Sequence, residues 1–314
     1  MKAHSNLAPS APLRFRDRCC SICGQTPQTV WMPAKVDITS LDSFAFASRK
    51  LPEYMHFDLA LCRECDLVFA NHVPVDEWFQ QSYTEASFDA SNESSFAAAT
   101  YGHELRKRLA KVSGLQRALD IGAGDGAFVA QLIDCGFAEV IGVEPSKEPV
   151  KRAPAHLQSR LINDFFRAED FEPSSFDLIT CFQTLEHVDQ PNQLFQAAHT
   201  LLKPGGCFMT VAHNFRAPLA RLMGDKSPIY DIEHLQLFSP KSLQRVYRHN
   251  GFVEIDISSI SNRYPLSYWM KLFPLPKSMK AVLMPRLSGS RLGNLMLGAR
   301  VGNMIGFAKK AAST

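Results

Sequence analysis

The stretch Arg117-Ala-Leu-Asp-Ile-Gly-Ala-Gly-Asp-Gly126 joins a short apolar run to a turn that contains three glycines. The apolar run predicts a buried strand, and the spacing over 125–135 predicts a helix directly after the turn. Glycines let the backbone of such a turn approach a ligand closely, and the helix N-terminus offers free N–H groups. The stretch therefore predicts a nucleotide-binding turn between a strand and a helix.

Segments with strand-like and helix-like patterns alternate on both sides of this turn, as they do in parallel α/β sheets. We expect strands at 116–121, 139–143, 159–163, 176–182, 206–212, 252–258 and near 303–308. We expect helices at 102–112, 125–135, 146–156, 191–202 and 240–250, the last of them after the start signal Ser239-Pro240. The predicted fold class is α/β: a Rossmann-like sheet of seven strands with helices on both faces.

Two acidic residues flank the predicted nucleotide site. Asp120 precedes the first glycine, and Glu144 follows the second strand, 24 residues further on. Glu144 suits the two hydroxyl groups of a ribose. The turn also fits the pattern G-x-G-x-x-A through Ala127, so a nicotinamide dinucleotide is the alternative ligand. The charge of Asp120 disfavours a pyrophosphate at this turn and favours an amino group.

Two further motifs distinguish between these ligands. Gln183-Thr-Leu-Glu-His187-Val follows the fourth predicted strand, and Leu201-Leu-Lys-Pro-Gly-Gly206 precedes the fifth. Over roughly residues 100–260 this order of motifs resembles the class I S-adenosylmethionine-dependent methyltransferases. The resemblance implies that the methionine end of the cofactor lies at Asp120, Gly122 and Gly124, the ribose at Glu144, the adenine at Asp164 and Phe165, and the transferred methyl near Gln183.

Four cysteines in the N-terminal part of the chain form two C-x-x-C pairs, Cys20/Cys23 and Cys62/Cys65. A tetrahedral zinc ion takes four thiolate or imidazole ligands, and each pair presents two sulfurs from one tight turn. Disulfides are the alternative in an oxidising compartment, and a redox dithiol would need only one pair. We expect a structural Zn²⁺, because four protein ligands leave no open position for chemistry. Cys19 lies one residue out of register and is either a spare thiol or a substitute for Cys20.

Three histidines fall at strand ends or loops on the expected active face: His187, His213 and His234. The segment from Tyr230 to Phe238 resembles a loop of bacterial sugar C-methyltransferases, which also carry an N-terminal four-cysteine zinc module, and of related small-molecule O-methyltransferases. The resemblance implies that His234 is the catalytic base, with Glu233 as its partner or an acceptor ligand and Tyr230 as an assisting hydroxyl. In the O-methyltransferases the histidine can instead be structural.

Charge is distributed unevenly along the chain. The net charge is +3, yet residues 258–314 contain nine basic side chains and no acidic one. Such asymmetry predicts contact with something anionic, either a phosphorylated or diphosphate-linked acceptor or an anionic membrane, and a solvated basic face is the alternative. Nucleic acid is not an expected partner, because the cysteine module is neither notably basic nor interleaved with stacking aromatics.

The domain organisation follows from these motifs. We expect a disordered lead-in over 1–18, a zinc-binding module over 19–70, a linker or active-site loop over 71–98, and a methyltransferase domain over 99–314 with a basic insertion at about 262–300. Tyr83, in the linker, resembles part of the aromatic loop that closes over the active site in the sugar C-methyltransferases. No signal peptide or long apolar run is found, so the expected location is cytoplasmic, with membrane contact through the basic region.

The leading hypothesis is methyl transfer from S-adenosylmethionine to O or C of a small molecule. The expected acceptor is a sugar, a nucleotide-linked sugar, or another natural-product or lipid-linked molecule. Two alternatives stay open: an RNA (rRNA base) methyltransferase with a zinc module, and a non-catalytic zinc scaffold. The intact Asp120, glycine turn and Glu144 argue against the scaffold.

Overall fold

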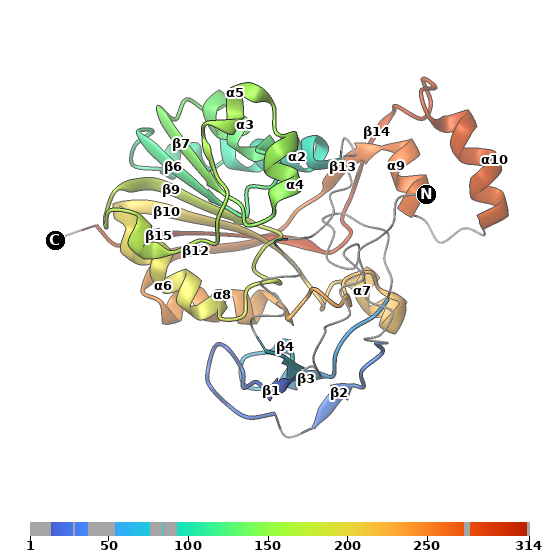
Figure 1. Ribbon diagram of the computed structural model, residues 1–314, viewed down its shortest axis with the longest axis horizontal. Helices are drawn as coiled ribbons and strands as arrows, with labels where there is room; N and C mark the ends of the chain where they lie inside the picture. The colour runs from blue at the N-terminus through green and yellow to red at the C-terminus, as the bar shows by residue number, and fades with distance from the viewer. Residues whose placement is uncertain are drawn as a thin grey trace.

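The computed structural model describes residues 14–27, 29–36, 54–75, 84, 93–272 and 277–312. Figure 1 shows a large α/β unit and, next to it, a smaller unit of short strands from the N-terminal part of the chain. The predicted loop residue Tyr83 and most of the predicted lead-in lie outside the described residues.

The large unit is built on a seven-stranded sheet in the order β12-β15-β10-β9-β6-β7-β8. Its strands are β6 (Arg117–Ile121), β7 (Glu139–Val143), β8 (Leu161–Ile162), β9 (Phe176–Phe182), β10 (Leu202–His213), β12 (Phe252–Ser259) and β15 (Asn303–Lys310). Strands β6 to β10 are parallel to one another, and β15 runs antiparallel between β10 and β12. The predicted seven-stranded sheet is confirmed, and it is mixed because β15 enters it in the reverse direction.

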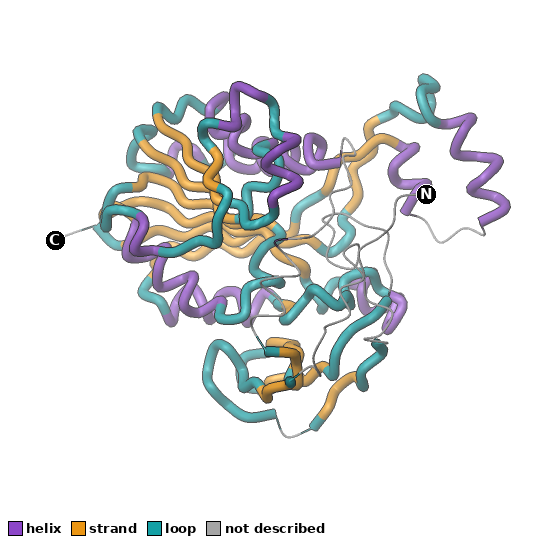
Figure 2. The backbone as a smooth tube through the Cα atoms, viewed as in Figure 1, coloured by secondary structure: helices purple, strands orange, loops and turns teal. Residues whose placement is uncertain are grey.

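Helices cover both faces of this sheet, as predicted (Figures 1 and 2). One face carries α2 (Glu93–Arg106), α3 (Ala127–Asp134), α4 (Lys147–Arg152) and α5 (Ala155–Gln158), and the other carries α6 (Pro191–Leu201) and α8 (Pro240–His249). The central strands β9 and β10 are consequently buried along most of their length.

Two helices differ from the predicted ranges for local reasons. The helix expected over 146–156 is broken into α4 and α5 at Pro154, because proline disfavours helical backbone at the residue before it. The helix expected over 102–112 begins earlier, at Glu93, and its last part is a separate 3-10 turn, Leu109–Lys111. The predicted start of α8 is confirmed: Ser239 caps the helix in a capping box with Ser242, and Pro240 occupies the first turn.

The smaller unit contains β1 (Phe15–Asp17), β2 (Val30–Met32), β3 (Leu59–Cys62), β4 (Leu67–Ala70) and β5 (His72–Pro74). Strands β1 and β5 pair with each other, so the predicted disordered lead-in is wrong from Phe15 onward and the predicted linker is wrong at β5. Its four-stranded sheet has the order β11-β4-β3-β2. Strand β11 (Gln236–Leu237) comes from the distant C-terminal half of the chain, so the two units share a sheet.

Three shorter segments surround the carboxyl ends of the large sheet's strands. Helix α7 (Pro218–Met223) and the 3-10 turn Gly224–Lys226 follow β10. Between β12 and β15 lies the predicted insertion, which contains β13 (Asn262–Pro265), α9 (Leu266–Leu272), α10 (Lys277–Leu287) and β14 (Met296–Ala299). Strands β13 and β14 form an antiparallel hairpin, from which α10 projects away from the body of the molecule (Figure 1). Among the described residues, no helix has the length and apolarity that a membrane crossing requires.

Candidate active site

A cleft of about 1630 Å³ opens at the carboxyl ends of the parallel strands. In open α/β sheets this edge is where ligands bind. Six of the seven residues that the sequence assigns to the cofactor line the cleft: Asp120, Gly122, Gly124, Glu144, Phe165 and Gln183. The predicted acceptor residues Glu233 and His234 line it as well, so the two predicted halves of the site meet in one cavity.

The glycine turn between β6 and α3 forms as predicted, and Gly122 has a steric reason to be glycine. Its φ is +79°, in the left-handed region that side chains rarely adopt. A Cβ at this position would also overlap the Thr184 side chain, lying 2.8 Å from Thr184 Cγ2. By contrast, a Cβ on Gly124 would meet no heavy atom of the described part of the chain within 4 Å. The turn is therefore packed on its Thr184 side and has free space around Gly124.

Two buried carboxyl groups lie beside this turn. Asp120 accepts a hydrogen bond from Thr180 Oγ1 at 2.7 Å, and burial raises the pKa of Asp120 to about 7. Glu144 accepts hydrogen bonds from the backbone N–H groups of Gly124 and Ser146, both at 2.9 Å, and burial raises its pKa too. A cationic ligand group or a pair of hydroxyl donors would relieve the cost of burying these carboxylates.

Gln183 follows β9 in a strained position. Its φ is +52°, and its side-chain Nε2 is buried with no hydrogen-bond partner among the described residues. Both features are unfavourable unless something compensates for them, and a buried unpaired donor in a cleft points to a ligand oxygen. Together with the two carboxyl groups and the open space at Gly124, this unpaired donor fits a polar adenosine-type cofactor such as S-adenosylmethionine.

Of the two residues predicted to contact adenine, the structure places only one in the cleft. Phe165 lines the cleft, but Asp164 does not. The Asp164 carboxylate instead forms an ion pair with Arg167 at 2.6 Å, which lowers the pKa of Asp164, and it also accepts a hydrogen bond from the backbone N–H of Phe165. The predicted contact between Asp164 and adenine is therefore not supported, because Asp164 does not line the cleft and its carboxylate is already paired with Arg167.

A group of imidazoles lies on the acceptor side of the cleft. The rings of His187 and His234 have centroids 5.0 Å apart, and His213 lies 5.3 Å from His234. Glu233 Oε2 lies 3.8 Å from His187 Nδ1. His234 Nδ1 lies 2.7 Å from the carbonyl oxygen of Ile229. Because a carbonyl only accepts, Nδ1 of the neutral ring carries the hydrogen, and Nε2 is left with a lone pair.

His213 has a different environment from the other two histidines. Its Nδ1 lies 2.9 Å from Asn303 Oδ1, and its backbone N–H donates to Glu186 Oε1. Burial lowers the pKa of His213 to about 3, so this ring stays neutral. Burial also raises the pKa of Glu186 to about 7. These two residues tie the end of β10 to the segment after β9, and His213 is poorly suited to hold a proton.

Tyr230, the predicted assisting hydroxyl, does not line the cleft. It is 4% exposed, and its ring packs 6.0 Å from Trp31 and 6.3 Å from His56, both in the N-terminal unit. Burial raises the pKa of its phenol. The structure thus corrects this prediction: Tyr230 contributes to packing between the two units rather than to the cleft.

The N-terminal unit holds the loop that carries Glu233 and His234. Strand β11 pairs with β4, with Gln236 opposite Phe69. Arg18, which is 4% exposed, donates to the carbonyl oxygens of Leu235 and Ala70 at 3.0 and 2.9 Å. His234 is therefore fixed from one side by the large unit and from the other by the small one.

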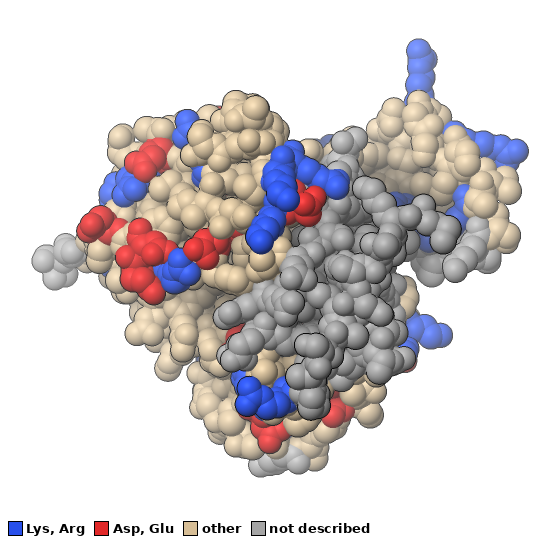
Figure 3. Space-filling view, viewed as in Figure 1, with Lys and Arg blue, Asp and Glu red and all other residues tan. Residues whose placement is uncertain are grey.

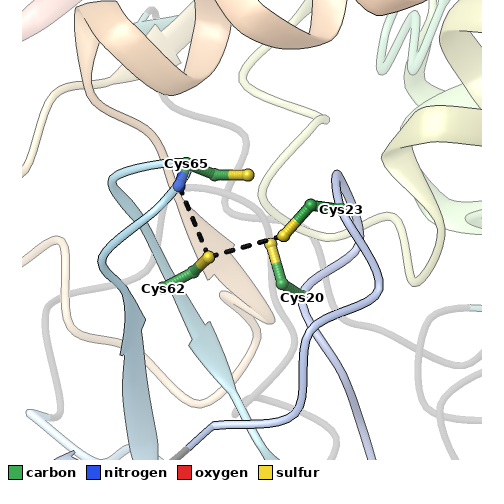
Figure 4. A group of neighbouring side chains, drawn as sticks. All are labelled: Cys20, Cys23, Cys62 and Cys65. Atoms are coloured by element: carbon green, nitrogen blue, oxygen red, sulfur yellow. Dashed lines mark hydrogen bonds between the residues drawn. The ribbon is translucent and has the colours of Figure 1, made fainter.

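The four predicted zinc ligands converge in the small unit, where Cys20, Cys62 and Cys65 belong to the same buried cluster as Leu243 of α8 (Figure 4). The sulfur atoms of Cys20, Cys23, Cys62 and Cys65 all lie within 4.8 Å of one another, and those of Cys23 and Cys62 are 3.6 Å apart. Burial raises the pKa of the Cys20 thiol to about 12, and a coordinated cation would favour its thiolate form. This all-sulfur donor set fits tetrahedral Zn²⁺.

The two cysteine turns have the same backbone design. The residue after each pair, Gly24 or Asp66, has a positive φ, and its N–H donates to the carbonyl oxygen of the first cysteine, Cys20 or Cys62. Such turns present both sulfurs to one side. All eight cysteines are free of disulfides, and Cys19 is exposed and outside the sulfur cluster.

Some residues of the cleft were not predicted. The insertion contributes an aromatic wall of Tyr264, Tyr268 and Trp269, with the rings of the first two 4.6 Å apart. Arg16 of β1 also lines the cleft and pairs with Asp189 at 2.7 Å. The sequence shows a cluster of aromatic residues in the insertion, but no local pattern predicts that this cluster packs against the cleft.

Residues 94–256, more than half of the chain, match the family described as a methyltransferase domain, and the chain belongs to this family. It is an S-adenosylmethionine-dependent methyltransferase. It is 33% identical over 157 residues to a ubiquinone biosynthesis O-methyltransferase of Chromobacterium violaceum, a match that covers 46% of this chain and 67% of that protein. A protein of the same name from Paraburkholderia phymatum is 32% identical over 159 residues, which cover 46% of this chain and 68% of the relative.

The chain also resembles a solved S-adenosylmethionine-dependent methyltransferase from Archaeoglobus fulgidus. The sequence identity is 18% and the TM-score is 0.47, over 75% of this chain and all of the other.

Proposed function

We propose that this methyltransferase methylates a hydroxyl oxygen of a small-molecule acceptor, such as a sugar, a nucleotide-linked sugar or another natural-product or lipid-linked molecule. The observation that carries the proposal is the position of His234, which lines the same cleft as the glycine turn and whose ring is oriented by the contact of Nδ1 with the Ile229 carbonyl oxygen. The relatives named O-methyltransferases favour oxygen over carbon as the acceptor atom.

The cofactor would lie along the glycine turn. Asp120 would hold the ammonium group of its methionine end, and Glu144 would accept hydrogen bonds from the ribose hydroxyls. Phe165 would cover one face of the adenine, and the unpaired amide of Gln183 would donate to an oxygen of the bound ligands. S-adenosylmethionine, when bound, supplies an electrophilic methyl group on a sulfonium.

His234 would act as the base. Its Nε2 takes the proton of the acceptor hydroxyl while the oxygen forms a bond to the methyl carbon, and the carbon–sulfur bond breaks with its electron pair left on sulfur. The products are the methyl ether, S-adenosylhomocysteine and a protonated His234. Glu233, whose carboxylate lies 3.8 Å from His187, would stabilise positive charge on these imidazoles.

The cysteine cluster would bind one structural Zn²⁺. Cys20, Cys23, Cys62 and Cys65 fill its four positions, so it takes no part in methyl transfer. Its function would be to join the turn after β1 to the β3–β4 hairpin, and through β11, which pairs with β4, to support the loop of Glu233 and His234.

The insertion would rest on an anionic membrane surface or bind a phosphorylated acceptor. Between Arg263 and Arg300 it carries seven basic side chains and no acidic one, and its visible part in Figure 3 shows only basic charge. Exposed apolar side chains accompany that charge: Met279, Val282, Leu292, Leu295, Met296 and Leu297. This combination is typical of surfaces that lie on anionic lipid. Co-sedimentation with phosphatidylglycerol vesicles but not with phosphatidylcholine vesicles would support the membrane.

Methyl transfer itself is tested with labelled cofactor. Zinc-loaded protein is incubated with methyl-labelled S-adenosylmethionine and a panel of sugars, nucleotide sugars and phenols, and the labelled products are identified. We expect label on an oxygen atom, and at least a hundredfold loss of turnover in His234→Ala, within the usual contribution of a general base. Label on carbon or on RNA, or undiminished turnover in His234→Ala, would contradict the proposal.

A further inference from the structure

The acceptor side of the cleft carries a second group of metal-ligand atoms, separate from the cysteine cluster. His187 comes from the loop after β9, and Glu233 and His234 come from the loop before β11. One ligand atom of each lies within 4.8 Å of the other two. Two segments that are distant in sequence thus place two imidazoles and one carboxylate around a common point.

The contacts of His234 prepare it for such a role. Its Nδ1–H is directed to the carbonyl oxygen of Ile229 at 2.7 Å, which fixes the tautomer and the ring. Metal-binding histidines almost always donate their second ring N–H to a carbonyl or a carboxylate in this way. Nε2 of the same ring is left as an electron-pair donor. His187 and His234 meet at 67° with centroids 5.0 Å apart, so their edges can be directed to one ion between them.

These three side chains lie at the wall of the cleft, so a metal ion bound by them would be open on the cleft side. His187, Glu233 and His234 all line the cleft, and so does Asp231. Their side chains are only partly exposed, 22% for His187 and 12% for Glu233. An ion held from the protein side would face the cleft with its remaining coordination positions. Two neutral imidazoles and one carboxylate also leave a divalent ion with a net charge of +1, which suits an oxygen ligand that is losing a proton.

We propose that His187, Glu233 and His234 bind a divalent first-row transition-metal cation, whose open positions take one or two oxygen atoms of the acceptor. This inference rests on the proposed methyl transfer to a hydroxyl group and names the acceptor class more narrowly, as molecules with a hydroxyl beside a second oxygen donor. Two histidines and one carboxylate are a donor set of catalytic metal sites with open positions. The cation would lower the pKa of the bound hydroxyl, whose proton would leave to water. His234 would then assist deprotonation by holding the cation, and this replaces the direct proton transfer to its ring described under the proposed function.

The test uses Co²⁺ and protein whose cysteine cluster is already loaded with zinc. Cobalt on nitrogen and oxygen ligands has weak visible bands and lacks the intense sulfur-to-metal band of a thiolate site, so the two locations are distinguished. We expect one further equivalent of Co²⁺ in the wild type, seen by absorbance and by calorimetry. We expect its affinity to fall at least tenfold in Glu233→Gln and in His187→Ala.

His249→Ala is the matched control, because His249 is an exposed histidine on α8. It should bind Co²⁺ like the wild type, and all variants should retain S-adenosylmethionine binding as evidence of folding. The absence of a second cobalt equivalent in the wild type, or equal affinity in Glu233→Gln, would overturn the metal site.

The outcomes also separate this inference from the proposed function. Full turnover in a chelator that removes the second ion but leaves the zinc would overturn the metal site and leave His234 as the base. Tight cobalt binding without methylation of any hydroxyl would overturn the proposed function and leave the metal site.

Discussion

Replacing Arg18 with methionine should destabilise the protein strongly, because this buried side chain joins the two units. Its guanidinium donates to the backbone carbonyl oxygens of Ala70, Leu235 and Asp189 at 2.9, 3.0 and 2.7 Å. It also forms an ion pair with the side chain of Asp189, whose Oδ1 lies 2.9 Å from Nε. It also donates to Gln236 Oε1 at 3.0 Å. Methionine keeps most of the volume and removes every one of these donors.

The expected magnitude follows from burial. The Asp189 carboxylate is 28% exposed and keeps its pair with Arg16, so the cost falls on the hydrogen bonds that the Arg18 guanidinium donates. A hydrogen bond to a charged group contributes about 1.5–3 kcal/mol, and Arg18→Met removes several of them. We expect Arg18→Met to lose about 4 kcal/mol of unfolding free energy, which corresponds to a fall in Tm of roughly 8 °C for a chain of this size.

Urea denaturation of zinc-loaded protein, followed by circular dichroism, measures this loss. Arg245→Met is the matched control: Arg245 pairs with Glu64 across the same boundary at 2.8 Å, but the side chains are 38% and 55% exposed. An exposed pair contributes less than about 1 kcal/mol. A loss below about 1 kcal/mol in Arg18→Met, or equal losses in both variants, would refute the view that Arg18 fastens the two units.

Three further outcomes are expected. Gly122→Ala should weaken S-adenosylmethionine binding at least tenfold, because the added Cβ overlaps Thr184. Gly136→Ala is the control, since Gly136 also has a positive φ but its Cβ would have no described neighbour closer than 3.8 Å, and it should leave the affinity unchanged. Calorimetry measures the affinity of both variants. Burial raises the pKa of Asp120 to about 7, so its carboxylate is charged above that pH and neutral below it. S-adenosylmethionine should therefore bind up to about tenfold more weakly at pH 6 than at pH 8, and a flat profile would contradict the contact. Cys65→Ser should lose the zinc and the hydrogen-exchange protection of β11, with cofactor affinity within twofold of wild type; protection that persists in the zinc-free variant would count against the coupling.

The parts of the site that depend on short sequence patterns were predicted well. The glycine turn, Asp120 and Glu144 lie in contiguous motifs whose backbone conformation is set locally, so the letters alone placed them at one edge of the sheet. The two cysteine pairs are also local turns, and only their convergence needed the fold. The same holds for Ser239, whose cap is formed within one turn of α8.

The parts that depend on contacts between distant segments were predicted poorly. Tyr230 packs on Trp31 because a two-residue strand, β11, joins the small unit, and so short a strand carries no periodic signal. Asp164 was misplaced for a different, local reason. Its carboxylate pairs with Arg167 three residues along the chain, and a carboxylate suits that partner as well as it suits an adenine amine. Strand β1 was expected to be disordered from its composition, yet it pairs with β5.

The shared sheet formed by β11 and β4 has a consequence for how this enzyme is inherited and engineered. A cysteine module that stood alone could be exchanged between relatives as a cassette. Here the strand that completes its sheet lies in the segment that also presents Glu233 and His234, more than a hundred and fifty residues away in the chain. A chimaera must therefore transfer both segments together.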